Sequence, residues 1–141
     1  MCPLTSTLTS ISKGVYVLMI VVRRDVTVNV GALGEVFFGK GLYAYVGSAQ
    51  KGLKNRVERH LRKVKHRFWH IDYLLGDDAV RVQAVFCKEA DKAEECRIAE
   101  ALGESGSPMK GFGSSDCQCM SHLFKVGEYQ FLSGTMYEVR L

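Results

Sequence analysis

The feature that most constrains this fold is an uninterrupted apolar run at Val15–Val22, with the sequence VYVLMIVV. A membrane-spanning helix needs about 20 apolar residues, so this run is too short to cross a bilayer. Its β-branched residues, without polar alternation, are typical of a strand that is covered on both faces. The run therefore predicts a central strand, in a chain of 141 residues that is long enough to bury a two-layer core.

The segments that follow predict a mainly antiparallel sheet. Val26–Val30 alternates valine with polar residues, and Glu35–Phe38 and Leu42–Gly47 are two further short strands between glycine-containing turns. We expect these strands and the central strand to form an antiparallel β-meander, in which the Val26–Phe38 part is an extra hairpin. The two-residue period places Tyr43 and Tyr45 on one face of their strand.

The rest of the chain predicts helices around this sheet, which makes the expected fold class α+β. Apolar residues at helical spacing predict a helix at Leu53–Val64 and another at Asp91–Leu102. In the second helix Glu95 begins the stripe that should face the sheet. A short helix and three more strands are expected at Phe68–Leu75, Val80–Cys87, Leu123–Val126 and Met136–Leu141, the last as an edge strand.

We expect a disordered tail at residues 1–13, one domain at 14–126 and a C-terminal extension at 127–141. Met1–Ser12 lacks the basic and apolar regions of a signal peptide, so we expect a soluble, cytoplasmic protein without a membrane partner. The five cysteines are an odd number, which favours reduced thiols over a disulfide framework.

Basic residues concentrate in Lys51–Arg67, which holds eight lysines and arginines against one acid, whereas the whole chain has a net charge of +4. This uneven distribution is typical of a surface that binds a polyanion, although a solvated helix face is the simpler alternative. On the predicted helix, Arg56 and His60 fall at the half-buried margin of the apolar stripe. The candidate nucleic-acid-binding residues are Lys51, Lys54, Arg59, Lys63, Lys65, Arg67 and His70.

Several motifs resemble the GIY-YIG nuclease superfamily. They are Gly14-Val15-Tyr16, Tyr43-Ala44-Tyr45-Val46-Gly47, Leu53-x-x-Arg56-x-x-x-His60 and Glu95-Cys96-Arg97-Ile98-Ala99. Two later motifs, at Trp69–Leu75 and Gly111–Leu123, are similar to a compact related group known as domain of unknown function 123. The resemblance covers about Gly14–Val126.

The resemblance implies a metal-dependent endonuclease. Tyr16 would be the general base, Tyr45 would orient water or phosphate, and Arg56 would bind the scissile phosphate. His60 would bind phosphate or relay a proton. Glu95 would bind Mg²⁺ or Mn²⁺, and DNA is the expected class of partner.

Other functions stay open at this point. The chain could be a non-catalytic nucleic-acid-binding module with the same fold, or an interaction domain whose basic helix meets an acidic partner. Cys117, Cys119 and His122 are ligand types that suit Zn²⁺, but their spacing is tight and no fourth ligand is evident. Buried thiols with a hydrogen-bonded histidine are the alternative there.

Overall fold

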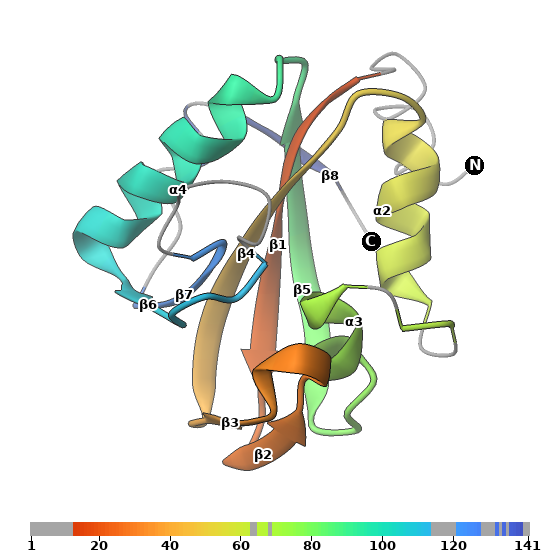
Figure 1. Ribbon diagram of the computed structural model, residues 1–141. Coiled ribbons are helices and arrows are strands. Elements are labelled where there is room, and N and C mark those ends of the chain that lie inside the picture. The colour runs from red at the N-terminus through yellow and green to blue at the C-terminus, as the bar shows by residue number, and fades with distance from the viewer. Residues whose placement is uncertain are drawn as a thin grey trace.

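The computed structural model describes residues 13–62, 65–67, 69–113, 121–127, 132, 134 and 136–139. It has the predicted α+β architecture, with a mainly antiparallel sheet flanked by helices (Figure 1). The elements are β1 (Gly14–Val22), β2 (Val26–Asn29), the 3₁₀ helix η1 (Gly31–Leu33), β3 (Glu35–Phe38), β4 (Gly41–Ala49), α2 (Leu53–Leu61), α3 (His70–Leu75), β5 (Val80–Lys88), α4 (Ala93–Ser105), β6 (Ser107–Pro108), β7 (Leu123–Val126) and β8 (Tyr137–Val139).

The central sheet has six strands in the order β6-β7-β4-β1-β5-β8. β1 pairs antiparallel with β4 on one side and with β5 on the other, and almost all of its residues are buried. The prediction of a central strand covered on both faces is therefore confirmed. β8 pairs with β5 at one end of the sheet, and β6 lies at the other.

β2 and β3 form the predicted extra hairpin, but this hairpin is a two-stranded sheet of its own and not part of one meander with β1 and β4. β1 instead pairs directly with β4 across the inserted hairpin. β2 alternates half-buried and exposed residues, so only one of its faces contacts the core. Its half-buried valines Val26 and Val28 pack against the main core, and Figure 1 shows the hairpin beneath the large sheet.

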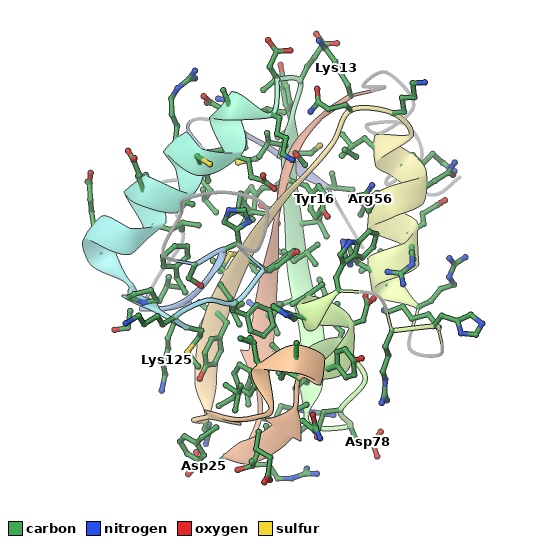
Figure 2. All side chains as sticks on the ribbon, in the orientation of Figure 1. Lys13, Tyr16, Asp25, Arg56, Asp78 and Lys125 are labelled. Atoms are coloured by element: carbon green, nitrogen blue, oxygen red, sulfur yellow. The ribbon has the colours of Figure 1, made fainter. Side chains whose placement is uncertain are left out.

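The sheet separates two apolar layers. Leu53 and Val57 of α2, with Ile71 and Leu74 of α3, cover one face, and α4 covers the other face through Ala99 and Leu102. Tyr43 and Tyr45 both lie in the layer under α2 and α3, as the two-residue period predicted, whereas Leu42, Ala44 and Val46 belong to the opposite layer. Figure 2 shows side chains filling both layers.

The helix boundaries differ from the predicted ones. α2 ends at Leu61, three residues earlier than expected, because Arg62 is extended with φ −77° and ψ 131°. The ammonium of Lys65 then binds the backbone oxygens of His60 and Arg62 at this helix end. α4 begins and ends later than predicted. Within the described residues, no helix has the length and apolar character needed to span a membrane.

Candidate active site

A cleft lies at the outer edge of β4, beyond the point where β7, its partner strand among the described residues, stops pairing with it. β7 pairs with β4 from Leu42 to Tyr45, and one further hydrogen bond joins the Val46 nitrogen to the His122 oxygen over 2.9 Å. Beyond that point the last residues of β4 pair with β1. Side chains from both layers meet at this edge around a cavity of about 470 Å³, lined by Tyr16, Tyr45, Gly47, Ser48, Gln50, Arg56, Trp69, His70, Lys92, Glu95, Gly113 and His122.

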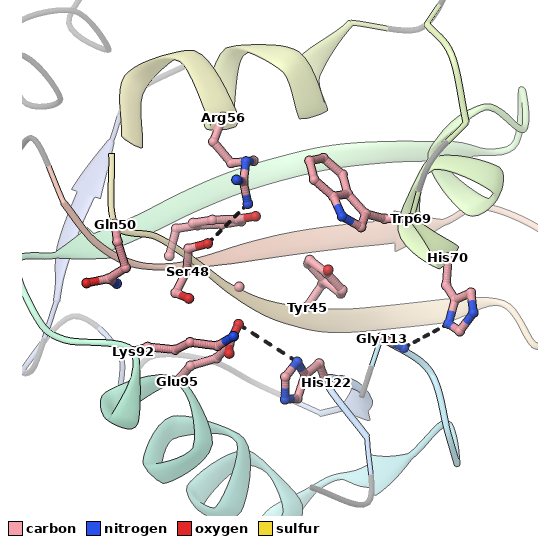
Figure 3. A pocket seen from close by; sticks show the side chains of 12 residues that line it. Tyr45, Ser48, Gln50, Arg56, Trp69, His70, Lys92, Glu95, Gly113 and His122 are labelled. Atoms are coloured by element: carbon pink, nitrogen blue, oxygen red, sulfur yellow. Dashed lines mark hydrogen bonds and ion pairs between the residues drawn. The ribbon is translucent and has the colours of Figure 1, made fainter. Parts of the chain in front are cut away.

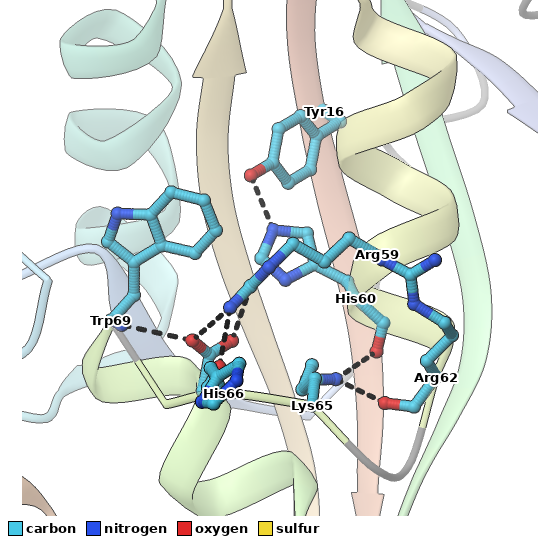
Figure 4. A network of polar contacts seen from close by, with 8 residues as sticks. Tyr16, Arg59, His60, Arg62, Lys65, His66 and Trp69 are labelled. Carbon is cyan, nitrogen blue, oxygen red and sulfur yellow. Dashed lines mark hydrogen bonds and ion pairs between the residues drawn. The ribbon is translucent and has the colours of Figure 1, made fainter.

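We call the side of the cleft formed by α2 and the segment before α3 the α2 wall. Its centre is a hydrogen bond of 2.7 Å between the Tyr16 hydroxyl and Nε2 of His60. Both residues are 2% exposed, so the expectation of a half-buried His60 at the helix margin was wrong. The ring turns inward, where it bonds Tyr16 and contacts the ring of Trp69 (Figure 4). It also contacts the ring of Tyr45.

Burial keeps this pair neutral. It raises the pKa of Tyr16, an effect that the nearby Arg56 guanidinium opposes. It also lowers the pKa of His60 to about 3, against the pull of the Asp72 carboxylate. Tyr16 can then donate its proton to Nε2 of His60 when the imidazole carries its own proton on Nδ1. That Nδ1 is buried and has no hydrogen-bond partner among the described residues.

Gly47 makes the position of the Tyr16 hydroxyl possible. The two residues are paired across β1 and β4, and a Cβ at position 47 would lie 2.5 Å from the Tyr16 oxygen and 2.6 Å from Cζ. Real side chains do not approach so closely. The glycine is therefore needed for space, because it lets the phenol lie against the backbone of β4 and reach the cleft.

Arg56 is held above the cleft by two contacts. Its Nη1 donates to the backbone oxygen of Ser48 over 3.1 Å, and its Cζ lies 4.6 Å from the centre of the Trp69 ring (Figure 3). Cation–π contacts of this kind favour a fixed guanidinium orientation. The sequence marked Arg56 as a site residue but gave no sign that Trp69 would stack on it.

Arg59 was predicted to contact nucleic acid, but its guanidinium binds groups within the protein. Its guanidinium binds both carboxylate oxygens of Asp72, over 2.9 Å and 3.0 Å, and lies 4.4 Å from the centre of the Trp69 ring. Asp72 is fully buried as a side chain and also accepts the backbone N–H of Trp69 over 3.0 Å. This network ties α2 to the start of α3 and fixes Trp69 (Figure 4).

We call the opposite side of the cleft the α4 wall. Glu95, in the first turn of α4, is 6% exposed and reaches the cleft as predicted for the stripe that it begins. Its Oε2 lies 3.9 Å from Nδ1 of His122, the residue immediately before β7 (Figure 3). Lys92 and Gln50 line the same part of the cleft.

The structure thus brings Tyr16, Tyr45, Arg56 and Glu95 to one cleft, with His60 bonded to Tyr16 behind it. Burial also raises the pKa of Tyr45. His70 lines the cleft too, where its Nδ1 accepts the backbone N–H of Gly113 over 3.0 Å.

The predicted basic surface is only partly solvated. Lys54 pairs with Glu58, Lys65 binds the end of α2, and Arg67 lies over the Tyr73 ring. Lys51 is exposed beside the cleft end of β4. Lys63 lies outside the described residues.

The sequence missed Trp69, Ser48, Gln50 and Lys92 as cleft residues, and it assigned His122 to a different group. Trp69 begins one of the motifs quoted above, but no local pattern marks it, Ser48, Gln50 or Lys92 as a cleft residue. His122 could have been placed only through the strand register, because it continues β7 by one residue and so lies opposite Val46.

The residues fit one hard divalent ion on the α4 wall. Glu95 offers a carboxylate at the cleft, and Mg²⁺ commonly takes one or two carboxylates while it keeps several waters. Among the described residues no three His, Cys, Asp or Glu side chains gather into a metal cluster. Cys117 and Cys119 of the predicted Zn²⁺ alternative lie outside those residues.

A comparison with protein-family models matches residues 15–140 to the family described as Domain of unknown function DUF123. The match covers both walls of the cleft and β8. Searches of curated proteins and of solved structures gave no match.

Proposed function

The chain belongs to the DUF123 family, and from that premise we propose that it is a metal-dependent endonuclease of the GIY-YIG type, which hydrolyses nucleic-acid phosphodiesters. The observation that carries this proposal is the convergence of Tyr16, Arg56 and Glu95 on one cleft from three different elements. A phosphodiesterase needs a base, a phosphate-binding cation and usually a metal ligand, and these three side chains supply one of each.

Arg56 binds the scissile phosphate in this proposal. A planar guanidinium donates two parallel hydrogen bonds to phosphate oxygens, and it stays charged at any physiological pH. Trp69 and the Ser48 carbonyl hold it at the cleft before substrate arrives. The Arg56 guanidinium therefore needs little reorientation when substrate binds, which lowers the entropic cost of reaching the transition state.

Tyr16 and His60 accept the proton of the attacking water. The water proton passes to the Tyr16 oxygen while the Tyr16 proton passes to Nε2 of His60, so His60 becomes an imidazolium. Burial lowers the pKa of His60 to about 3 and so opposes this transfer, whereas the Asp72 carboxylate raises the pKa of His60 and favours it. Arg56 lowers the pKa of Tyr16 and also that of His60. His60 is uncharged before the transfer, as a proton acceptor must be.

Glu95 would hold the divalent ion, which supplies charge stabilisation to the phosphate oxygens when it is bound. Lys92 and Lys51 offer further cations near the cleft for the phosphate backbone.

The test is cleavage of branched, nicked and linear DNA and of RNA, with Mg²⁺ or Mn²⁺. We expect Arg56→Lys and Glu95→Gln to lower the rate by about 100-fold or more, since removal of one transition-state contact commonly costs 10²–10³. Glu100→Gln on the exposed side of α4 is the matched control and should keep the wild-type rate.

Trp69 is the single tryptophan of the chain and lines the cleft, so its fluorescence reports binding separately from cleavage. Salt-dependent binding without cleavage of any substrate would favour the non-catalytic module. Absence of binding as well would exclude both nucleic-acid functions.

A further inference from the structure

A metal site with Glu95 as its single protein ligand would not need His122, yet the two side chains lie close together in the cleft. Oε2 of Glu95 and Nδ1 of His122 are 3.9 Å apart, which is too long for a hydrogen bond. Both side chains are more than nine-tenths buried and both line the cleft. Figure 3 shows the carboxylate and the imidazole directed toward one another on the α4 wall.

The space between the two atoms can hold one ion. In octahedral coordination, with metal–ligand bonds of about 2.1 Å, neighbouring ligand atoms lie about 3 Å apart and opposite ones about 4.2 Å apart. The observed separation of 3.9 Å lies between these values. The two side chains must therefore approach one another by about 0.9 Å to bind one ion as neighbouring ligands.

His122 is also held firmly enough to act as a ligand. Its backbone N–H donates to the oxygen of Phe112 over 2.8 Å, and its own oxygen accepts the N–H of Val46 over 2.9 Å. The neighbouring Ser121 hydroxyl donates to the backbone oxygen of Met109 over 2.7 Å. These bonds fix the backbone on both sides of the imidazole, and metal sites depend on such support.

We propose that His122 binds the divalent ion together with Glu95, and that the site consequently prefers Mn²⁺ to Mg²⁺. Mg²⁺ takes oxygen ligands almost exclusively, whereas imidazole nitrogen suits transition metals. Lys92 places a positive charge on the same wall, and this charge repels Mn²⁺ and Mg²⁺ alike. The preference between the two ions therefore depends on the type of ligand atom. This inference deepens the proposed function and rests on its assignment of Glu95 to the metal.

The test is calorimetric titration of the full chain with Mn²⁺ and with Mg²⁺, without nucleic acid. We expect Mn²⁺ to bind at least about tenfold more tightly. His122→Asn should lower Mn²⁺ affinity about tenfold or more and leave Mg²⁺ affinity nearly unchanged, and Glu95→Gln should weaken both. His66→Asn, at an exposed histidine between α2 and α3, is the matched control and should change neither.

Equal affinities of the wild type for both ions would overturn the proposal, as would an unchanged Mn²⁺ affinity in a folded His122→Asn variant. A Zn²⁺ affinity that survives Glu95→Gln but falls in Cys117→Ser would also overturn it, because His122 would then serve the cysteines. If His122→Asn does not fold, the imidazole NMR signals decide: Zn²⁺ must shift those of His122 and not those of His66, in the wild type and in Cys117→Ser alike. Failure of cleavage alone would overturn the nuclease proposal and leave the metal pair standing.

Discussion

The two walls of the cleft differ in the charge of the side chains that they place beside it. On the α2 wall, Tyr16 and His60 are neutral, buried and hydrogen-bonded to one another. On the α4 wall, Glu95 and His122 are 3.9 Å apart beside the cation Lys92. α2 and α4 cover opposite faces of the sheet, yet Tyr16, Glu95 and His122 line the same cavity.

The first way to break this comparison is to remove Asp72, which anchors the α2 wall. Asp72→Ala leaves the Arg59 guanidinium without its bidentate partner and the Trp69 N–H without its acceptor. Loss of one partner of a buried ion pair costs about 3–5 kcal/mol, so we expect the free energy of unfolding to fall by that amount. Urea denaturation measures it.

Glu58→Gln is the control for Asp72→Ala, because it removes a half-exposed ion pair with Lys54 one turn away on the same helix. We expect it to cost less than about 0.5 kcal/mol. Similar losses in the two variants would show that the Asp72 network does not anchor the wall.

The second prediction concerns the contact between Tyr16 of the α2 wall and Gly47 of β4. Gly47→Ala places a methyl group 2.5 Å from the Tyr16 hydroxyl, and overpacking of this kind costs about 1–3 kcal/mol. Tyr16 must shift, so its bond to His60 should lengthen or break. Gly127→Ala is the matched control, since a Cβ there has no described atom within 4 Å and should change the free energy of unfolding little. Wild-type stability of Gly47→Ala would contradict the close approach.

The third prediction sharpens the contrast by testing the neutrality of His60 through pH. The folded pKa of about 3 lies below the ordinary value of 6.5, so between these values the unfolded chain binds a proton that the native protein does not. The free energy of unfolding should therefore fall by about 1.4 kcal/mol for each pH unit below 6.5 on account of this residue. Other groups titrate too, so the wild type is compared with His60→Gln by denaturation at several pH values. Parallel curves would contradict the buried, neutral imidazole.

The sequence predicted the parts of the fold that depend on local periodicity. The apolar run at Val15–Val22, the shared face of Tyr43 and Tyr45 and the sheet-facing position of Glu95 each follow from a two-residue or helical repeat. The pairing of β1 with β5 could not be predicted in this way, because strand order depends on contacts distant in the chain.

The candidate site likewise contains residues that local motifs predicted and contacts that depend on distant parts of the chain. Tyr16, Arg56 and Glu95 were predicted from motifs, whereas the inward turn of Arg59 depends on Asp72, thirteen positions later. Spacing grouped His122 with Cys117 and Cys119, but strand register placed it beside Glu95. A local pattern reports residue type and periodicity, and it contains no information on which distant carboxylate or ring completes a contact.

Among the described residues, the outer edge of β4 has no partner strand beyond Val46, and this has a consequence for self-association. Unpaired backbone groups at a sheet edge can accept a strand from another molecule, and proteins commonly block such edges with charge. In the described part of the chain, Arg56 blocks this one by binding the Ser48 carbonyl and placing a guanidinium beside the edge. Its removal therefore exposes a strand to edge-to-edge aggregation, and Arg56→Lys, which keeps a cation there, is a safer substitution than Arg56→Ala.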